Sequence, residues 1–171
     1  MKAVCSSGNP LTAEDAAGSL RRVVKLNKTP AFILTQFGLT PENVDQMITF
    51  EGDTVTLKTD KAYAPSFVYN CLTAGVANIV DMKTVMANEV EGDMGNAWLK
   101  ANSAGTGAYV LKSFKPNEGY VLEANPTHWR GAPKLAAAMQ DARIASIEGS
   151  GHALMAEYPD AVLDALRGFI A

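Results

Sequence analysis

The sequence predicts an α+β fold with two β-hairpins, short helices around them, and a strand–helix unit at the C-terminus. Residues 47–58 alternate between apolar and polar types around Glu51-Gly52-Asp53, which predicts the first hairpin. Residues 108–124 alternate around the turn residues 115–119 and predict the second hairpin. Residues 12–27 instead place apolar side chains at helical spacing.

The sequence predicts where the first helix begins, where it ends and which of its residues form an apolar face. Thr12 is expected to cap its N-terminus, with Asp15 three residues later as the partner in a capping box. Lys28-Thr29-Pro30 is expected to end the helix. Its apolar face is predicted to hold Ala16, Leu20, Val23, Val24 and Asn27.

Three basic residues, Arg21, Arg22 and Lys25, lie toward the other side of this helix. An anionic partner is one explanation for them. A solvated helix face is the favoured one, because charged residues usually lie on such faces.

The remaining elements are short. Residues 31–38 are expected to form a helical turn or a buried loop, and Thr40-Pro41-Glu42 is expected to start a helix with Pro41 at the first helical position. Residues 63–71 are predicted to be helical, with Pro65 in the first turn. Residues 76–80 suggest a short strand, and two further short helices are predicted over 83–89 and 96–102.

Composition excludes several classes of function. The chain has 171 residues, of which 47% are hydrophobic and 19% charged, and its formal net charge is -3. No basic stripe indicates a nucleic-acid partner, and no apolar run approaches the ~18 residues needed to span a membrane. Cys5 and Cys71 are too few for a disulfide framework and are expected to be free thiols, with Cys71 in the core.

No metal or other cofactor is expected. Residues 91–96 contain two acids and an amide, but they lack the alternating ligands and closing glutamate of a calcium loop, so a turn is favoured. His128 and His152, together with Glu123 or Glu148, have ligand types suited to zinc or iron. Their spacing supports no such site.

Two segments carry a family resemblance. Residues 105–109 read GTGAY, and residues 125–134 read NPTHWRGAPK. Together they resemble the GTGPY…NPxYWRGxPK signature of the family 5 extracellular solute-binding proteins of ABC importers, with Ala108 in place of the usual proline. SSGNPLTAEDAAGSLRRV, at residues 6–23, is similar to the segment that begins the smaller lobe of that family.

The resemblance implies that residues 1–134 are a truncated lobe of a periplasmic-binding-protein-like fold. Ligand capture in that family uses a cleft between two lobes and a hinge. The expected function is therefore residual binding of a small molecule or peptide-like ligand without efficient catalysis. Because an exposed sheet edge favours pairing, self-association through the hairpin 108–124 is also expected.

The family works outside the inner membrane, in the periplasm or extracellularly. The first residues of this chain contain no apolar core of the kind that a secretory signal requires. As written, the product is expected to be cytoplasmic.

Residues 135–171 resemble a different family. A strand over 143–147, a turn Gly149-Ser150-Gly151-His152 and an amphipathic helix are similar to the C-terminal end of α/β-hydrolases. In that family the position of His152 carries the general base. The predicted apolar stripe of the helix is Val162, Leu163, Leu166, Phe169 and Ile170.

The alternative function is thus a small esterase or lactonase in which His152 activates water, free or metal-bound. A serine hydrolase also needs a G-x-S-x-G nucleophile elbow and an acid. The sequence contains no such elbow, and the region where the acid is expected is solute-binding sequence. The favoured interpretation is that His152 has no catalytic role and is part of the turn that accompanies the C-terminal helix.

Five aromatic residues lie along the signature region. They either form a ligand platform or pack in the core of a β-rich unit, and the core is favoured. They are Trp98, Tyr109, Phe114, Tyr120 and Trp129.

Overall fold

The computed structural model describes residues 3–116, 119–131, 133, 160 and 163–164. The chain divides into two compact units, Met1–Pro133 and Lys134–Ala171. In the second unit Asp160, Leu163 and Asp164 are helical, whereas the predicted strand 143–147 and the His152 turn lie outside the described residues.

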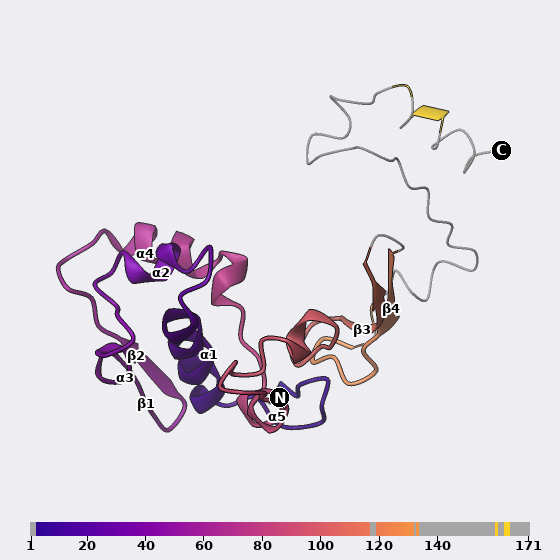
Figure 1. Ribbon diagram of the computed structural model, residues 1–171, viewed down its shortest axis with the longest axis horizontal. Coiled ribbons are helices and arrows are strands. Elements are labelled where there is room, and N and C mark those ends of the chain that lie inside the picture. Colours follow the sequence, from indigo (N-terminus) through magenta and orange to yellow (C-terminus); the bar gives the residue numbers. More distant parts are fainter. Residues whose placement is uncertain (1–2, 117–118, 132, 134–159, 161–162, 165–171) are drawn as a thin grey trace. The chain divides into compact units, whose positions relative to one another are not determined.

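The first unit has the predicted α+β class (Figure 1). Short helices precede and follow one hairpin, and a second hairpin comes at the end of the unit. The elements are α1 (Ala13–Leu26), α2 (Phe32–Thr35), α3 (Val44–Met47), β1 (Ile48–Glu51), β2 (Thr54–Leu57), α4 (Pro65–Leu72), η1 (Gly75–Ala77), α5 (Met82–Ala87), η2 (Trp98–Lys100), β3 (Tyr109–Lys115) and β4 (Gly119–Ala124).

Helix α1 begins as the sequence predicts. The Thr12 hydroxyl accepts a hydrogen bond from the Asp15 N–H at 3.2 Å, and the Asp15 carboxylate accepts one from the Thr12 N–H at 2.9 Å. This reciprocal pair satisfies two N–H groups that a helix start leaves unbonded. The prediction for Asn27 is wrong, because Asn27 is the exposed left-handed C-cap (φ 46°) and not part of the apolar face.

The core of the unit forms around α1, which contacts β1, β2, α2, α3, α5 and η1 (Figure 1). Phe37 is fully buried, and its ring meets those of Tyr63 and Phe67 edge-on at 5.1 and 5.7 Å. Cys71 is partly buried and packs against this core. The buried cluster is Ala17, Leu20, Val24, Leu34, Phe37, Leu39, Val44, Ile48 and Ala77.

Both predicted hairpins are confirmed. Strands β1 and β2 pair antiparallel from Ile48↔Leu57 to Glu51↔Thr54, and Gly52 supplies the positive φ (57°) in the turn. Strands β3 and β4 pair from Tyr109↔Ala124 to Lys115↔Gly119, with a bulge between Leu111 and Ser113.

The predicted strand over residues 76–80 is wrong. Residues 75–77 form η1, and residues 78–80 have no regular secondary structure and no strand partner among the described residues. The reason is a long-range contact, because the Ser19 hydroxyl accepts the Val80 N–H at 3.0 Å and donates to the Val80 carbonyl at 3.2 Å. A side chain on α1 thus takes the place of a neighbouring strand.

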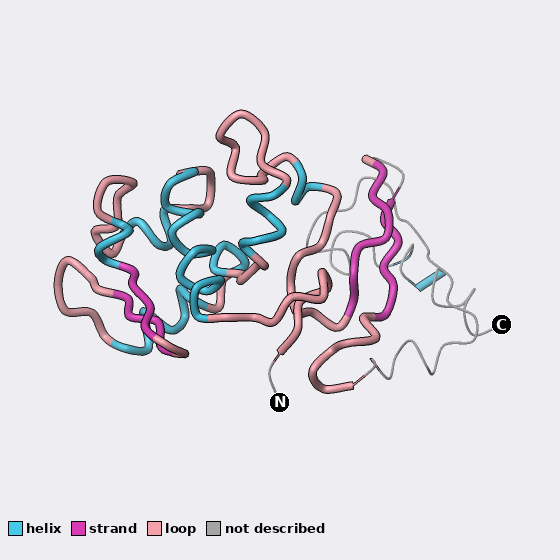
Figure 2. The backbone as a smooth tube through the Cα atoms, turned by 90° about the horizontal axis from the view of Figure 1, so that it is seen from below, coloured by secondary structure: helices cyan, strands magenta, loops and turns pink. Residues whose placement is uncertain are grey.

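The expectation that the five aromatic residues form a core is wrong for four of them, whereas the fifth, Trp98, is half-buried. Tyr120 is 63% exposed, Trp129 and Phe114 are each 45% exposed, and Tyr109 is 36% exposed. Figure 2 shows the β3–β4 hairpin extending from the helical part of the same unit, and the rings on this hairpin, those of Tyr109, Phe114 and Tyr120, are exposed. Among the described residues, no helix is long and apolar enough to cross a membrane.

Candidate ligand-binding cleft

The buried carboxylate of Asp81 has a structural role. It is 1% exposed and accepts hydrogen bonds from Ser7 Oγ (2.5 Å), Asn9 Nδ2 (2.8 Å), and the Thr84 N–H and hydroxyl (3.0 and 2.6 Å). Burial raises the pKa of Asp81, but these hydrogen bonds outweigh it and hold the pKa well below its usual range. Asp81 also caps α5, so it joins the N-terminal loop to that helix.

Cys5 lies buried beside this network. Burial and the nearby carboxylates of Asp81 and Asp15 raise the pKa of its thiol to about 11. Since the thiolate is the reactive form, the burial of Cys5 and its raised pKa disfavour reaction of this thiol at neutral pH.

A cleft of about 240 Å³ lies between α1 and the segment around η1. We call it the α1 cleft. Residues Ser19, Arg22, Val23 and Leu26 form one wall, because positions i, i+3, i+4 and i+7 share a helix face. The rest of its lining includes Lys28, Pro30, Val76, Asn78 and Asn96. Two cations and two amides therefore border one concave, partly apolar surface.

Arg22 is held in a fixed position at this cleft. Its Nε donates to the Met94 carbonyl at 2.7 Å. Within the described part of the chain, its two terminal amino groups have no hydrogen-bond partner. Burial lowers the pKa of Arg22, and Asp93 partly offsets this, but a guanidinium remains protonated in proteins.

The turn that positions Arg22 is organised by Asp93. Its carboxylate accepts backbone N–H groups from Val90 (3.1 Å), Gly95 (2.8 Å) and Ala97 (2.7 Å). These hydrogen bonds, with that from Ala97 strongest, lower the pKa of Asp93. The structure thus has a turn over 91–96, as predicted, and the turn carries both the Met94 carbonyl and Asn96.

Gly95 fixes this turn against α5. Its φ is +68°, and a Cβ at this position would lie 2.5 Å from the Val85 carbonyl oxygen. Only glycine combines that backbone conformation with so close an approach.

The other basic residues of α1 bind within the unit. Arg21 donates from Nε to the Ile48 carbonyl at 2.8 Å, and Lys25 pairs with Asp45 at 2.7 Å. The predicted solvated basic face is therefore only partly correct, because Arg21 and Arg22 bind backbone carbonyls at half-buried positions.

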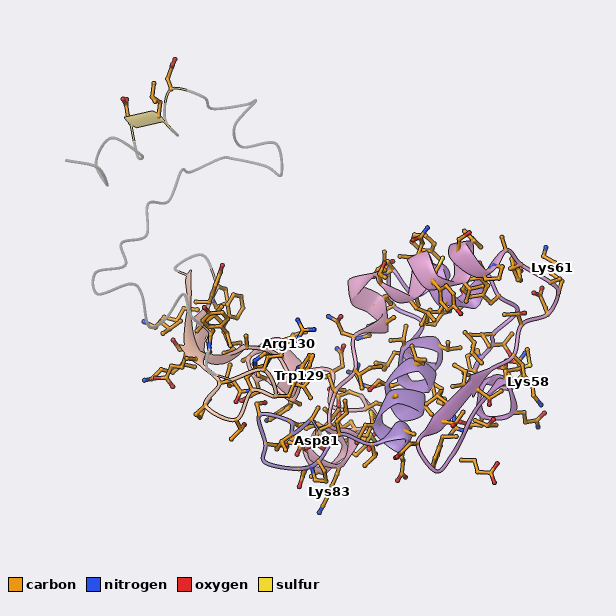
Figure 3. All side chains as sticks on the ribbon, turned by 180° about the vertical axis from the view of Figure 1, so that it is seen from behind. Lys58, Lys61, Asp81, Lys83, Trp129 and Arg130 are labelled. Atoms are coloured by element: carbon orange, nitrogen blue, oxygen red, sulfur yellow. The ribbon has the colours of Figure 1, made fainter. Side chains whose placement is uncertain are left out.

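The signature loop is rigidly built but exposed. Asn125 is 1% exposed; its Nδ2 donates to the Gly107 carbonyl at 2.9 Å, and its Oδ1 accepts the Thr127 N–H at 3.1 Å. Trp129 and Arg130 follow, with the guanidinium 4.4 Å from the centre of the indole (Figure 3). This cation–π pair occupies one face of the only described tryptophan in the loop.

Of the two candidate histidines, only His128 lies among the described residues. His152 and Glu148 lie outside the described residues. His128 lies in the signature loop, where its Nδ1 is 3.1 Å from the Gly131 carbonyl oxygen, and Glu123 pairs with Lys112. The described residues contain no group of three or more histidine, cysteine or acidic side chains placed to hold a metal.

Two larger cavities have chemistry less suited to a solute. One, of about 580 Å³, is bordered by Asp15 and Asp81, whose carboxylates are already hydrogen-bonded to the chain. The other, of about 430 Å³, is lined mainly by small and apolar residues near Leu11 and Val55. Lys83 lines the first of these cavities beside three carboxylates, and Asp53 lines the second, whereas the α1 cleft is bordered by Arg22 and Lys28 with no carboxylate in its lining.

The α1 cleft was missed in the sequence. Its walls come from residues 19–30, 75–80 and 96, which no local pattern connects. A signal was present, because Ser19, Arg22, Val23 and Leu26 mix polar and apolar residues along one helix stripe. A purely structural stripe is ordinarily apolar.

Comparison with known proteins gives one family. The model of the bacterial extracellular solute-binding proteins, family 5, middle region, matches residues 5–140. No curated protein matches this chain.

A solved structure supports the same fold. A crystal structure of NikA from Staphylococcus aureus in complex with Ni(L-His)2 is similar, with a TM-score of 0.51 and 24% sequence identity. The similarity covers 77% of this chain and 24% of the NikA chain, so this chain spans about a quarter of that protein. Since the family model covers well over half of the sequence, the chain belongs to the bacterial extracellular solute-binding proteins, family 5.

Proposed function

We propose that this chain binds a small solute carrying a carboxylate or another oxyanion in the α1 cleft. The observation that carries the proposal is the state of Arg22, whose Nε is fixed by the Met94 carbonyl while its terminal amino groups remain available. Membership of a solute-binding family supports a small ligand, as does NikA, which is bound to Ni(L-His)2.

The chemistry of the cleft favours an anionic group. A guanidinium presents its donors in a planar fork that matches a carboxylate, and fixing Nε in advance reduces the entropy lost on binding. Lys28 adds a second positive charge, and Asn78 and Asn96 add amide donors and acceptors.

The size of the cleft limits the ligand. A volume of about 240 Å³ is below the ~300–1,000 Å³ of sites for drug-sized ligands. A single amino acid, a dicarboxylate or one end of a short peptide is therefore the expected class. The apolar wall formed by Val23, Leu26 and Val76 suits the aliphatic part of such a ligand.

Isothermal titration calorimetry with glutamate, succinate and dialanine tests the proposal. The Arg22→Gln variant is expected to weaken binding by roughly 10–100-fold, since a hydrogen bond to a charged group contributes about 1.5–3 kcal/mol. Lys25→Gln is the matched control, because Lys25 lies on the same helix but pairs with Asp45 outside the cleft. Its affinity should equal that of the unmodified chain.

Two results would contradict this proposal. One is equal affinity of the Arg22→Gln and Lys25→Gln variants for a ligand that binds. The other is equal binding of succinate and its neutral diamide, since the cleft is proposed to select charge.

Succinate affinity should also fall as salt is raised, because added ions screen partly exposed charges.

The second candidate is hydrolysis through His152, which is supported by the sequence pattern of residues 143–170. We propose that any turnover of p-nitrophenyl acetate depends on His152 and uses water as nucleophile. It should be weak, since one positioned base contributes only ~10²–10⁴-fold. Turnover should fall in His152→Ala and persist after a serine-directed phosphonate.

Three controls separate the alternatives for this activity. His128→Ala, which changes the other histidine, should leave turnover unchanged. Stoichiometric labelling of one serine by the phosphonate with loss of turnover would instead indicate an acyl-enzyme. Loss of turnover with EDTA would indicate a metal-bound water.

A further inference from the structure

The β3–β4 hairpin has one apolar face, and its other face mixes the charged Lys115 and Glu123 with Val121. Cross-strand partners point to the same side of a sheet, so the register Leu111↔Leu122 and Phe114↔Tyr120 places these four residues on one face. Tyr120, Leu122 and Phe114 are 63%, 48% and 45% exposed. Among the described residues, β3 and β4 form a sheet of two strands only.

Such a hairpin is incomplete as a structural unit. Two strands alone are marginally stable in water, and three or more strands, or packing on a helix, are normally required. Each outer edge also offers backbone N–H and C=O groups that pair readily with another strand.

The two edges of this hairpin differ. The β3 edge carries Lys112, Lys115 and the bulge, all of which discourage strand addition. The β4 edge, in contrast, runs through Tyr120, Val121 and Leu122, and its one charged residue is Glu123. Strand addition is therefore expected at β4.

We propose that β4 pairs antiparallel with β4 of a second copy, centred on Leu122. This register is compatible with twofold symmetry, because Leu122 faces Leu122 and Glu123 faces Val121 across the pair. No like charges oppose each other. An antiparallel β3–β3 pair centred on Lys112, the middle residue of β3, would oppose Lys112 with Lys112, which disfavours that register.

The resulting sheet has four strands and a continuous apolar face. Directly opposite residues lie on the same side of an antiparallel pair. The Leu122 and Tyr120 side chains of both copies therefore extend one surface. A second copy thus supplies the strands that each hairpin lacks.

Disulfide crosslinking of the full chain tests this arrangement. In the proposed register the two copies of residue 122 have Cα atoms about 4.5–5.5 Å apart, which lies within the usual disulfide range. In a Cys71→Ser background, Leu122→Cys is expected to form a covalent dimer under mild oxidation. Phe114→Cys, with similar exposure but on β3, is expected to remain mostly uncrosslinked.

Light scattering after size-exclusion chromatography provides the second measurement. At tens of micromolar the unmodified chain is expected to be dimeric, and Leu122→Lys, which opposes two lysines, is expected to be monomeric. Phe114→Lys should remain dimeric. A monomeric unmodified chain, or crosslinking through residue 114 in preference to 122, would overturn the proposal.

Discussion

Replacing Asp81 with alanine is expected to lower the free energy of unfolding by about 3 kcal/mol, since hydrogen bonds to a charged group contribute ~1.5–3 kcal/mol each and their loss leaves donors unpaired. Three different residues, Ser7, Asn9 and Thr84, donate to this carboxylate, and Asp81 is 1% exposed. For a chain of this length the melting temperature should fall by roughly 6–12 °C.

The same site predicts a pH dependence. The folded-state pKa of Asp81 is lowered, so the unfolded chain takes up a proton before the folded chain does. Its contribution to stability is then complete above the ordinary aspartate pKa of about 3.9 and is lost as pH falls toward the lower folded value. Asp81→Asn should remove this part of the acid sensitivity.

Chemical denaturation at pH 7 and at pH 3.5 checks both expectations. Glu51→Gln, which changes an exposed carboxylate on β1, is the control and should alter stability by less than about 0.5 kcal/mol. An Asp81→Ala variant as stable as this control would show that the network joining the N-terminal loop to α5 contributes nothing.

Replacing Phe37 with alanine should have the largest effect of any substitution in the core, about 3–5 kcal/mol. The ring is fully buried and meets both Tyr63 and Phe67 edge-on, so its loss leaves a cavity between α2 and α4. Because domains are stable by only ~5–15 kcal/mol, this variant is expected to melt far below the unmodified chain.

The neighbouring Phe32 is a matched control. It has the same side chain in the same segment but is 65% exposed. Phe32→Ala should therefore change stability by less than about 0.5 kcal/mol. Should Phe37→Ala fail to fold, Phe37→Leu, which retains most of the buried volume, provides a measurable intermediate. Equal stability of the Phe32 and Phe37 variants would contradict the packing described.

Local chemistry explains which elements the sequence predicts well. The Thr12–Asp15 capping box, Gly52 in the β1–β2 turn and Pro65 in the first turn of α4 each act within four residues. Such signals do not depend on the rest of the fold. They therefore identify helix starts and turns from sequence alone.

Long-range contacts explain the errors. Residues 76–80 have a strand-like composition, but Ser19 binds the Val80 backbone from a position 61 residues away. The aromatic residues of β3 and β4 have a core-like composition, yet the hairpin leaves them exposed. Neither outcome is encoded in the neighbouring residues.

The α1 cleft shows the same limit for function. In the sequence, Arg22 is one of three basic residues on the same helix. The structure distinguishes it, because its Nε donates to the carbonyl of Met94, which is 72 residues away. The family resemblance, in contrast, was visible in short contiguous motifs, and the family match over residues 5–140 confirms it. Motifs thus identified the family, whereas the candidate site required the structure.

Nuclear magnetic resonance titration of the ¹⁵N-labelled chain with succinate tests the central proposal most directly. Binding in the α1 cleft predicts that the largest shifts of backbone amides and of the Arg22 Nε–H signal fall around Arg22, Lys28, Asn78 and Asn96. The amides of β1 and β2 should remain unchanged. Shifts confined to other parts of the chain, or no saturable shift up to millimolar succinate, would contradict binding of an anionic solute at this cleft.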